Sequence, residues 1–210
     1  MLASLRKNGI RLALFAIGCT ALVAITDHFT RQQIAFQESE NLQQKLSQML
    51  PPGSYDNELS NSCRLLINPD YLGDNRPHPI YVARKGSKVS GLIIESIAPN
   101  GYSGAIRLLT GITADGKISR VQVLEHRETP GLGDKIDRSK SSWIDSFNNQ
   151  SLHGATDPRW AVKRDGGMFD AFTGATITPR AVVAAVKRVL LLVQEQPALI
   201  EQAKSCQESP

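Results

Sequence analysis

A threonine-containing motif ahead of an apolar periodic segment holds the residues with the clearest chemical potential. It runs from Asp170 to Thr178 (Asp-Ala-Phe-Thr-Gly-Ala-Thr-Ile-Thr) and leads into residues 179–193, whose wide apolar stripe predicts an amphipathic helix. Thr176 is therefore expected beside N–H groups that have no partner within the helix, at the positive end of the helix dipole. A phosphate is stabilised at such a place, and a phosphate esterified to the Thr176 hydroxyl would stay there permanently.

An ordinary helix start explains the same residues without any ligand. Thr178 and Pro179 form a good pair for the N-cap and the first helical position. In that interpretation Thr173 and Thr176 have no chemical role. In the phosphate-binding interpretation, Asp170 assists recognition of the segment by a modifying enzyme. The residues alone leave both interpretations open.

A second motif, residues 125–134, follows a predicted strand and reads Glu-His-Arg-Glu-Thr-Pro-Gly-Leu-Gly-Asp. Its Thr-Pro-Gly sequence favours a tight turn. Two glycines on either side of Leu132 let the main chain lie close to a flat ligand while the leucine packs on it. A plain turn with a solvated charge cluster is the alternative. His126 is an available proton carrier, but a histidine at a strand end is more often held by a neighbour, so no catalytic residue is assigned.

Three other features are weaker candidates for ligand contacts. The loop 100–104 (Asn-Gly-Tyr-Ser-Gly) offers amide donors to a ligand or is simply a loop. Lys163 and Arg164 lie in a predicted hairpin turn, where they are either solvated or help to neutralise a phosphate. Trp143 and Phe147, spaced four residues apart, are expected in the core rather than as a platform for stacking.

The elements that must position these motifs are predicted by a change in hydrophobic period along the chain. Strands are expected over 80–83, 89–97, 105–113 and 117–125, with the hairpin signal Asp-Gly at 115–116, and another strand over 160–162. Helices are expected over 139–147 and 179–193, whereas residues 54–79 are expected to be irregular. This pattern predicts an α+β fold with one mixed domain.

The N-terminal segment resembles a membrane anchor. Residues 12–26 carry no charge, and with Arg11 extending toward the headgroups the span 9–26 approaches the roughly 20 residues that a bilayer needs. Arg6 and Lys7 precede it and Asp27 follows it, so the positive-inside rule places residues 1–8 in the cytoplasm and the rest outside. A cleaved signal peptide is one alternative, but the segment ends without a clear small-residue cleavage site. A buried core helix is the other, and the asymmetric charges on the two sides of the segment argue against it.

A helical connector is expected between the anchor and the exported domain. Within residues 27–53 the apolar residues Leu42, Leu46, Met49 and Leu50 recur at helical spacing until Pro-Pro-Gly ends the pattern. The domains are therefore predicted as a cytoplasmic N-terminus at 1–8, a transmembrane helix at 9–26, an amphipathic connector at 27–53 and an exported domain at 54–210.

Composition and cysteine usage exclude several classes of function. The chain has 24 Lys+Arg against 20 Asp+Glu, but beyond Arg11 the count is 21 against 20, so the exported part does not suit nucleic acid. Cys63 and Cys206 would lie in an oxidising compartment where a disulfide is possible, and their spacing matches no metal motif. Motifs of dinucleotide dehydrogenases, P-loop NTPases, zinc proteases and serine hydrolases are missing from the sequence.

The two motifs together resemble a known family. Thr173-Gly174-Ala175-Thr176, with Asp170 ahead of it, is similar to the flavinylation motif of covalent FMN-binding domains. The residues Glu-Thr-Pro-Gly-Leu-Gly at 128–133 are similar to the second signature of the same domains. Together with a single N-terminal anchor, the two motifs resemble the RnfG (RsxG) family, whose members belong to the Rnf (Rsx) ion-translocating electron transport complexes. This family is related to the NqrC component of the sodium-pumping NADH:quinone reductase.

The resemblance implies a cofactor, a site and partners. FMN is expected to be bound through a phosphoester to Thr176, installed from FAD by a flavin transferase. The surrounding cofactor-binding residues are expected to be Thr173, Gly174, Ala175, Thr129, Gly131, Leu132 and Gly133. The chain is expected to relay electrons between other redox subunits of an oxidoreductase that translocates ions across the bacterial inner membrane, with most of its residues periplasmic. Neither a catalytic side chain nor a metal is expected.

Two other functions fit the sequence less completely. One is an anchored, non-redox scaffold or binding module of an envelope complex, whose glycine loops are only turns. The other is a stand-alone flavin reductase that acts on a diffusible substrate.

Overall fold

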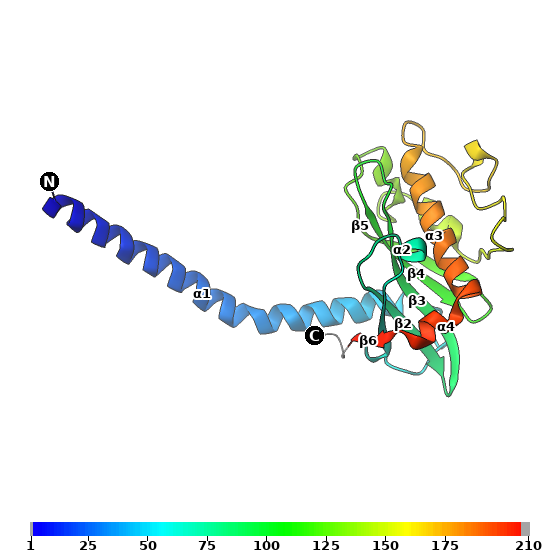
Figure 1. The fold of residues 1–210 in the computed structure, drawn as a ribbon, viewed down its shortest axis with the longest axis horizontal. Helices are drawn as coiled ribbons and strands as arrows, with labels where there is room; N and C mark the ends of the chain where they lie inside the picture. The colour runs from blue at the N-terminus through cyan, green and yellow to red at the C-terminus, as the bar shows by residue number, and fades with distance from the viewer. Residues whose placement is uncertain (1, 207–210) are drawn as a thin grey trace. The chain divides into compact units, whose positions relative to one another are not determined.

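A six-stranded antiparallel sheet forms the centre of the unit that begins at Lys45 (Figure 1). The computed structural model describes residues 2–206 of the 210-residue chain, apart from the side chains of residues 2–5, 7, 25 and 28–41. The strands are β1 (Cys63–Leu66), β2 (His78–Lys85), β3 (Lys88–Ala98), β4 (Ile106–Thr113), β5 (Ile118–Glu125) and β6 (Lys204–Ser205), in the order β5-β4-β3-β2-β1-β6. The prediction of β2 to β5 is confirmed. Strand β1 was not expected, since residues 54–79 were interpreted as irregular, and β6 was not expected either.

The described residues also form four helices and four 3₁₀ turns. They are α1 (Leu2–Ser47), α2 (Pro69–Leu72), α3 (Ile177–Glu195) and α4 (Pro197–Gln202), with 3₁₀ turns η1 (Ser60–Ser62), η2 (Gly133–Ile136), η3 (Trp143–Phe147) and η4 (Lys163–Asp165). The long amphipathic helix is confirmed, and the expected helix over 139–147 is present as the shorter η3. The expected strand over 160–162 is wrong, because Val162 makes only a single bridge to Phe169.

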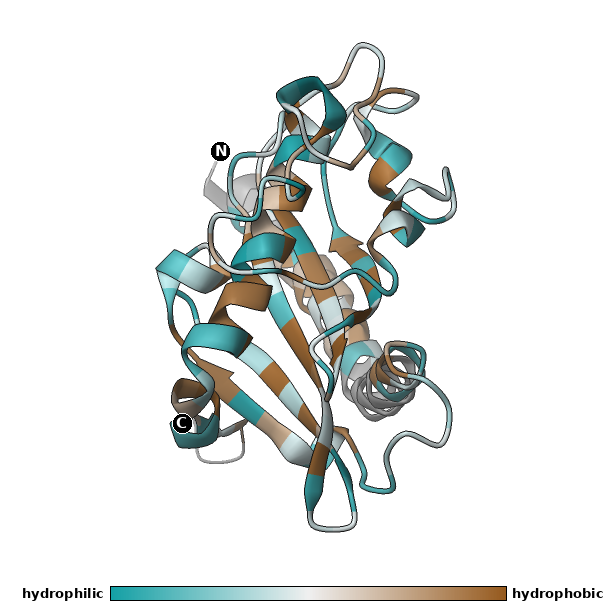
Figure 2. Ribbon diagram, turned by 90° about the vertical axis from the view of Figure 1, so that its right-hand side faces the viewer, coloured by the Kyte–Doolittle hydropathy of each residue, from teal (hydrophilic) through white to brown (hydrophobic). Residues whose placement is uncertain are grey.

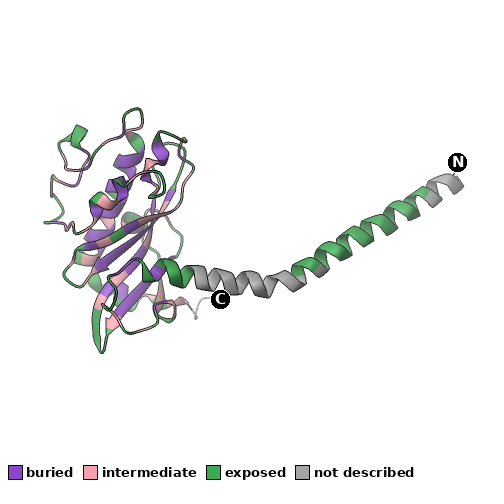
Figure 3. Ribbon diagram, turned by 180° about the vertical axis from the view of Figure 1, so that it is seen from behind, coloured by how far each residue is buried: buried purple, intermediate pink, exposed green. Residues whose placement is uncertain are grey.

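Both faces of the sheet are buried, each under a different part of the chain. Ile80 and Ile94, opposite each other on β2 and β3, belong to a large core that also includes apolar side chains of α3. Their neighbours Tyr81 and Ile93 point to the other face and form a smaller core with residues of the segment 46–59. Figure 2 shows the resulting alternation of apolar and polar residues along the strands, and Figure 3 shows the buried sheet and α3. This two-sided packing is what a period of two predicts for a covered sheet.

Glycine at position 111 permits the close approach of the segment that covers the smaller core. A Cβ there would lie 2.2 Å from the carbonyl oxygen of Met49. Leu46, Met49 and Leu50 are buried, so the apolar residues that predicted the end of a connector belong to the globular unit.

Contacts divide the chain into two units, one up to Gln44 and the other from Lys45 onward. In the first unit, the described part of α1 exposes large apolar side chains: Ile10, Leu12, Leu14, Phe15, Ile17, Leu22 and Val23. Within the described residues, no helix combines the length and the apolar character that crossing a membrane requires. Most side chains of the predicted connector, residues 28–41, lie outside the described residues.

A disulfide joins Cys63 on β1 to Cys206, which directly follows β6, with the two Cα atoms 5.4 Å apart. The bond connects residues 143 positions apart in the sequence and attaches the end of the described chain to β1, the strand next to the edge strand β6. The pairing that the sequence left open is present in the structure.

Candidate functional site

Both motifs line one cavity of about 260 Å³. Its lining residues are Tyr102, Glu128, Thr129, Leu132, Gly133, Gly174, Ala175, Thr176, Ile177 and Thr178. Six of the eight cofactor-binding residues expected from the sequence are therefore together. The other two, Thr173 and Gly131, are exposed neighbours that do not line the cavity.

Thr176 lies at the N-cap position of α3, and its side chain makes no capping hydrogen bond. The residue is partly exposed. The N–H groups of the first helical turn lack partners within the helix and carry the positive end of its dipole. A phosphate on the Thr176 oxygen would therefore be close to these donors.

The expected role of Thr178 as N-cap is wrong. The helix begins at Ile177, and the fully buried Thr178 hydroxyl donates a hydrogen bond to Oε2 of Glu128 instead. Pro179 is consequently the third helical residue. The N–H groups of the first turn have no partner within the helix, so a proline at this position removes no helical hydrogen bond. Thr178 therefore makes a long-range hydrogen bond to Glu128 instead of capping the helix.

The turn before Thr176 brings the first motif against the second. The Ala175 N–H donates to the carbonyl of Phe172 at 3.2 Å, and Gly174 has φ +81°, a conformation that favours glycine. A Cβ built on Gly174 would lie 3.4 Å from Cδ2 of Leu132. The Leu132 side chain therefore packs directly against this turn.

The second motif forms a tight loop around one carbonyl group. The Thr129 oxygen accepts hydrogen bonds from the N–H groups of Leu132 and Gly133, both at 3.1 Å, and from that of Asp134 at 3.4 Å. Gly131 has φ +77°. The predicted tight turn is confirmed, and it presents Leu132 at the mouth of the cavity.

Glu128 is the residue of the site that the sequence analysis missed. It is only 4% exposed, and its Oε1 accepts the Ser103 N–H at 3.0 Å while its Oε2 accepts the Thr178 hydroxyl. The available signal was an acidic residue placed directly before a tight turn. Its two partners are distant in the sequence, so their identity was not visible there.

Exposed apolar side chains surround the cavity. Tyr102, Leu132 and Ile177 are 67%, 41% and 46% exposed, and all three line it. Large apolar groups exposed together commonly mark a binding surface. The loop 100–104 thus contributes Tyr102 to the cavity and the Ser103 N–H to Glu128.

Ion pairs hold the segment beside the helix start. Arg180 binds Asp165 through two hydrogen bonds of 2.6 Å, and Lys163 pairs with Asp170 at 2.6 Å. The hydrogen bond from Arg180 lowers the pKa of the Asp165 carboxyl. Lys163, one of the two cations considered for a phosphate, therefore already has an acidic partner.

Two residues singled out in the sequence have structural roles. Trp143 packs edge-on against Phe147 and Phe172, and its Nε1 donates to the Asp170 carbonyl at 2.8 Å, so its predicted place in the core is confirmed. The Nδ1 of His126 accepts the Glu128 N–H at 3.2 Å, as expected for a histidine held by a neighbour.

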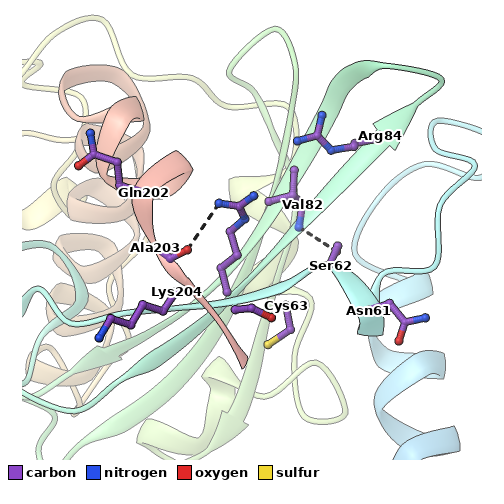
Figure 4. Close-up of a pocket in the computed structure, with 10 residues that line it drawn as sticks. Asn61, Ser62, Cys63, Val82, Arg84, Gln202, Ala203 and Lys204 are labelled. Atoms are coloured by element: carbon purple, nitrogen blue, oxygen red, sulfur yellow. Dashed lines mark hydrogen bonds between the residues drawn. The ribbon is translucent and has the colours of Figure 1, made fainter. Parts of the chain in front are cut away.

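A larger cavity, about 460 Å³, lies beside the disulfide (Figure 4). It is lined by Asn61, Ser62, Cys63, Arg64, Val82, Arg84, Gln202, Ala203, Lys204 and Ser205, none of which belongs to either motif. Arg64 donates to the carbonyl oxygens of Glu201 and Ala203, and so holds the end of α4. The cavity beside the disulfide is larger than the motif cavity, but the chemistry of the lining residues favours the motif cavity as the candidate functional site.

Comparison with known proteins identifies the family. Residues 101–191 match the family model of the FMN-binding domain, and residues 1–49 match that of the RnfG N-terminal region. Similar proteins occur in Aliivibrio fischeri (50% identity, 90% of each chain), Yersinia pestis (49%, 99% of each chain) and Photorhabdus laumondii (48%, 99% of each chain). All three are named as the G-type subunit of an ion-translocating oxidoreductase complex.

The chain belongs to this RnfG family. All ten residues that line the motif cavity fall within the stretch that matches the FMN-binding domain. Among solved structures, NqrC of Shewanella oneidensis is similar at 21% identity with a TM-score of 0.46, over 66% of this chain and 68% of that one. The resemblance that the sequence carried, to RnfG proteins, is confirmed.

Proposed function

We propose that this chain is the flavoprotein subunit of a membrane-bound ion-translocating oxidoreductase complex, and that it carries FMN through a phosphoester to Thr176. Membership of the RnfG family and the match to the FMN-binding domain support the general role. The observation that carries the specific site is the position of Thr176. Its side chain makes no capping hydrogen bond at the N-terminus of a 19-residue helix, and the residue lines the cavity that both motifs form.

Several features of the cavity support FMN as its ligand. Helix N–H groups suit its phosphate. Tyr102, Leu132 and Ile177 provide exposed apolar surface suited to a flat ring system. Gly174, with its positive φ, keeps the turn before Thr176 compact. Side chains from both motifs would therefore hold opposite parts of one molecule, the phosphate at α3 and the ring toward the loop 128–133.

Attachment of the cofactor requires a second enzyme. A flavin transferase would bring FAD to the exposed segment around Thr176. The threonine oxygen would then form a bond to the phosphorus next to the flavin, the pyrophosphate bond would break, and AMP would leave as the hydroxyl proton is released. A covalent bond is useful outside the cytoplasm, because a dissociated cofactor would be difficult to replace there.

FMN, once bound, supplies one-electron chemistry, as a relay between redox subunits requires. This chain's residues bind and orient the cofactor, and no general acid or base is needed. The partners are other subunits of the same complex, consistent with the names of the relatives.

We also propose that residues 9–26 anchor the chain in the inner membrane, with residues 1–8 cytoplasmic and the domain periplasmic. The support is the uncharged stretch 12–26 behind three cations and the exposed apolar side chains along this part of α1. A reporter enzyme that is active only in the periplasm, fused after residue 206, should be active. If this fusion is inactive, and a reporter that works only in the cytoplasm is active at the same position, the chain has the opposite orientation.

Covalent flavin attachment can be tested on a denaturing gel. The chain produced with an active flavin transferase should give a fluorescent band near 22.9 kDa. Thr176→Val should lose this band, whereas Thr156→Val, which changes an exposed threonine outside both motifs and outside the cavity, should keep it. A dark wild-type band would refute the covalent flavin, and a fluorescent Thr176→Val band would move the attachment site elsewhere.

A further inference from the structure

We propose that Glu128 is a positioning residue of the flavin site: its buried carboxylate fixes the start of α3 and the loop 100–104 so that the Thr176 hydroxyl faces the cavity in the geometry needed for flavin transfer. The inference rests on the proposed function and deepens it. Glu128 acts through other residues and is not itself the attachment site.

The first argument is the position of the carboxylate between three chain segments. Glu128 belongs to the loop after β5, its Oε1 accepts the Ser103 N–H at 3.0 Å, and its Oε2 accepts the Thr178 hydroxyl. Burial leaves the side chain 4% exposed. An acidic side chain is rarely buried so completely unless it is paired. Its oxygens accordingly use a backbone donor from one segment and a hydroxyl donor from another.

Glycines make room for this carboxylate on two sides. A Cβ on Gly133 would lie 2.9 Å from Oε2 of Glu128 and 2.9 Å from the Thr178 hydroxyl oxygen. A Cβ on Gly101 would lie 2.9 Å from Oε1 and also 2.2 Å from the carbonyl oxygen of Gly104. At Gly133 the space is needed specifically by the Glu128–Thr178 pair, so the second glycine of the loop motif serves this contact.

The hydrogen bond to Thr178 affects Thr176 because the two residues share the first turn of α3. Fixing one inward-facing side chain sets the rotation of that short turn about the helix axis. Thr176, two residues away, is then fixed on the side that opens to the cavity. In the same way, the bond to the Ser103 N–H holds the adjacent Tyr102, which also lines the cavity.

Loss of this positioning should slow flavin transfer more than it disturbs the fold. Glu128→Gln keeps the size of the side chain but removes its charge and one of its two acceptor oxygens, so the Thr178 hydroxyl can at best accept from the new NH₂ group instead of donating to a carboxylate. Thr178→Val keeps the shape of the partner but removes its hydroxyl. A lost hydrogen bond to a buried carboxylate is a large local effect, so the initial rate of loading from FAD should fall about tenfold or more in each variant.

Two matched variants separate positioning from general damage. Thr178→Ser retains the hydroxyl and should restore loading to near the wild-type rate. Glu125→Gln changes a 57% exposed carboxylate three residues earlier, which pairs with Arg107 outside the cavity, and should also load normally. The double variant Glu128→Gln/Thr178→Val should be slowed by less than the product of the two single effects, because both remove the same contact.

A measurement on the flavin-free protein tests the same contact without transfer. Hydrogen exchange in a peptide containing Ser103 should accelerate in Glu128→Gln, and exchange in a peptide of the sheet centre, such as one from β3, should stay unchanged. Rates of loading are compared at a temperature at which near-ultraviolet circular dichroism shows each variant folded. If Glu128→Gln is not folded at that temperature, the comparison of Thr178→Val with Thr178→Ser alone decides the result.

The outcomes distinguish this inference from the proposed function. If wild type is loaded at Thr176 and either Glu128→Gln or Thr178→Val loads at the wild-type rate, the positioning role is refuted while the flavin site stands. If Thr178→Ser is as slow as Thr178→Val, the hydroxyl bond is not the cause and the inference also fails. If wild type itself is never loaded, the proposed function fails and the inference falls with it.

Discussion

The cavity at the start of α3 and the cavity beside the disulfide are built by different means. Two loops and a helix start form the first, about 260 Å³, around a buried carboxylate and exposed apolar side chains. Strands β1 and β2 and the segment 202–205 line the second, about 460 Å³, with Arg64, Arg84 and Lys204 in its wall. An adjoining cavity that shares Arg64 and Arg84 reaches Val193, about 26 Å along α3 from Thr176.

The larger volume therefore does not by itself favour the cavity beside the disulfide as the functional site. The larger cavity follows from how the end of the chain is attached to the sheet edge. In the smaller one, residues with specific chemistry come together from segments far apart in the sequence. The comparison predicts that changes at the disulfide affect stability without affecting flavin attachment, whereas changes at the motif cavity affect flavin attachment beyond any loss of stability that they cause.

The largest effect on stability is expected from removing the disulfide. The double variant Cys63→Ser/Cys206→Ser frees a loop closed over 143 positions and should lower the free energy of unfolding by about 2–5 kcal/mol. Urea denaturation measures this change. Flavin loading, assayed where the variant is still folded, should match wild type. Slower loading would show that the two regions are coupled and would undo the comparison.

A smaller effect on stability, with a large effect on loading, is expected at Gly174. Gly174→Ala places a side chain at φ +81° and should cost about 1–2 kcal/mol of stability. Gly166→Ala is a matched control, since Gly166 has φ +86° and open space around its Cβ position. Both variants should lose similar stability in urea, but only Gly174→Ala should load flavin slowly. Equal loading would mean that the turn before Thr176 tolerates distortion.

The exposed leucine of the second motif should matter for the cofactor alone. Leu132→Ala should change the free energy of unfolding by less than about 0.5 kcal/mol, because the side chain is already 41% exposed. It should nevertheless alter the fluorescence of attached flavin by exposing the ring to water. Ile67→Ala, at a 59% exposed position on the loop after β1, should leave that fluorescence unchanged. If Leu132→Ala also leaves the flavin fluorescence unchanged, the ring lies away from Leu132.

Local sequence patterns predicted the elements whose causes are local. The four strands β2 to β5 follow from alternation and from the Asp-Gly turn at 115–116, and α3 follows from its apolar stripe. Strands β1 and β6 were missed because they have only four and two residues and exist through pairing with distant parts of the chain. Their short sequences carry no period that a pattern could reveal.

The same division applies to the candidate site. The motifs identified Thr176 and the loop around Leu132 because their turn residues carry local signals. The contact between Glu128 and Thr178 spans 50 positions, so the sequence suggested a local N-cap where the structure has a long-range hydrogen bond. The proximity of the motifs depends on packing of the whole domain, which neither motif encodes by itself.

The smallest effect is expected from a histidine that lines neither cavity. His78 is buried at the start of β2, with its Nε2 2.7 Å from Asp74 and its Nδ1 3.8 Å from Glu95. Burial alone would lower the pKa of His78, but the carboxylates of Glu95 and Asp74 outweigh burial and raise it above the ordinary value of 6.5. The folded protein therefore binds a proton more tightly here than the unfolded chain does.

The resulting contribution to stability is complete below pH 6.5 and is lost as the pH rises through the folded-state pKa. The free energy of unfolding should thus decrease modestly as the pH rises from below 6.5 through the folded-state pKa of His78, and His78→Gln should flatten that dependence. Urea denaturation across the range measures both. Because His78 lines neither cavity, the variant's flavin loading at one fixed pH should equal that of wild type. An unchanged pH slope in His78→Gln would assign the titration to another group, and a loading defect would extend the site beyond the motif cavity.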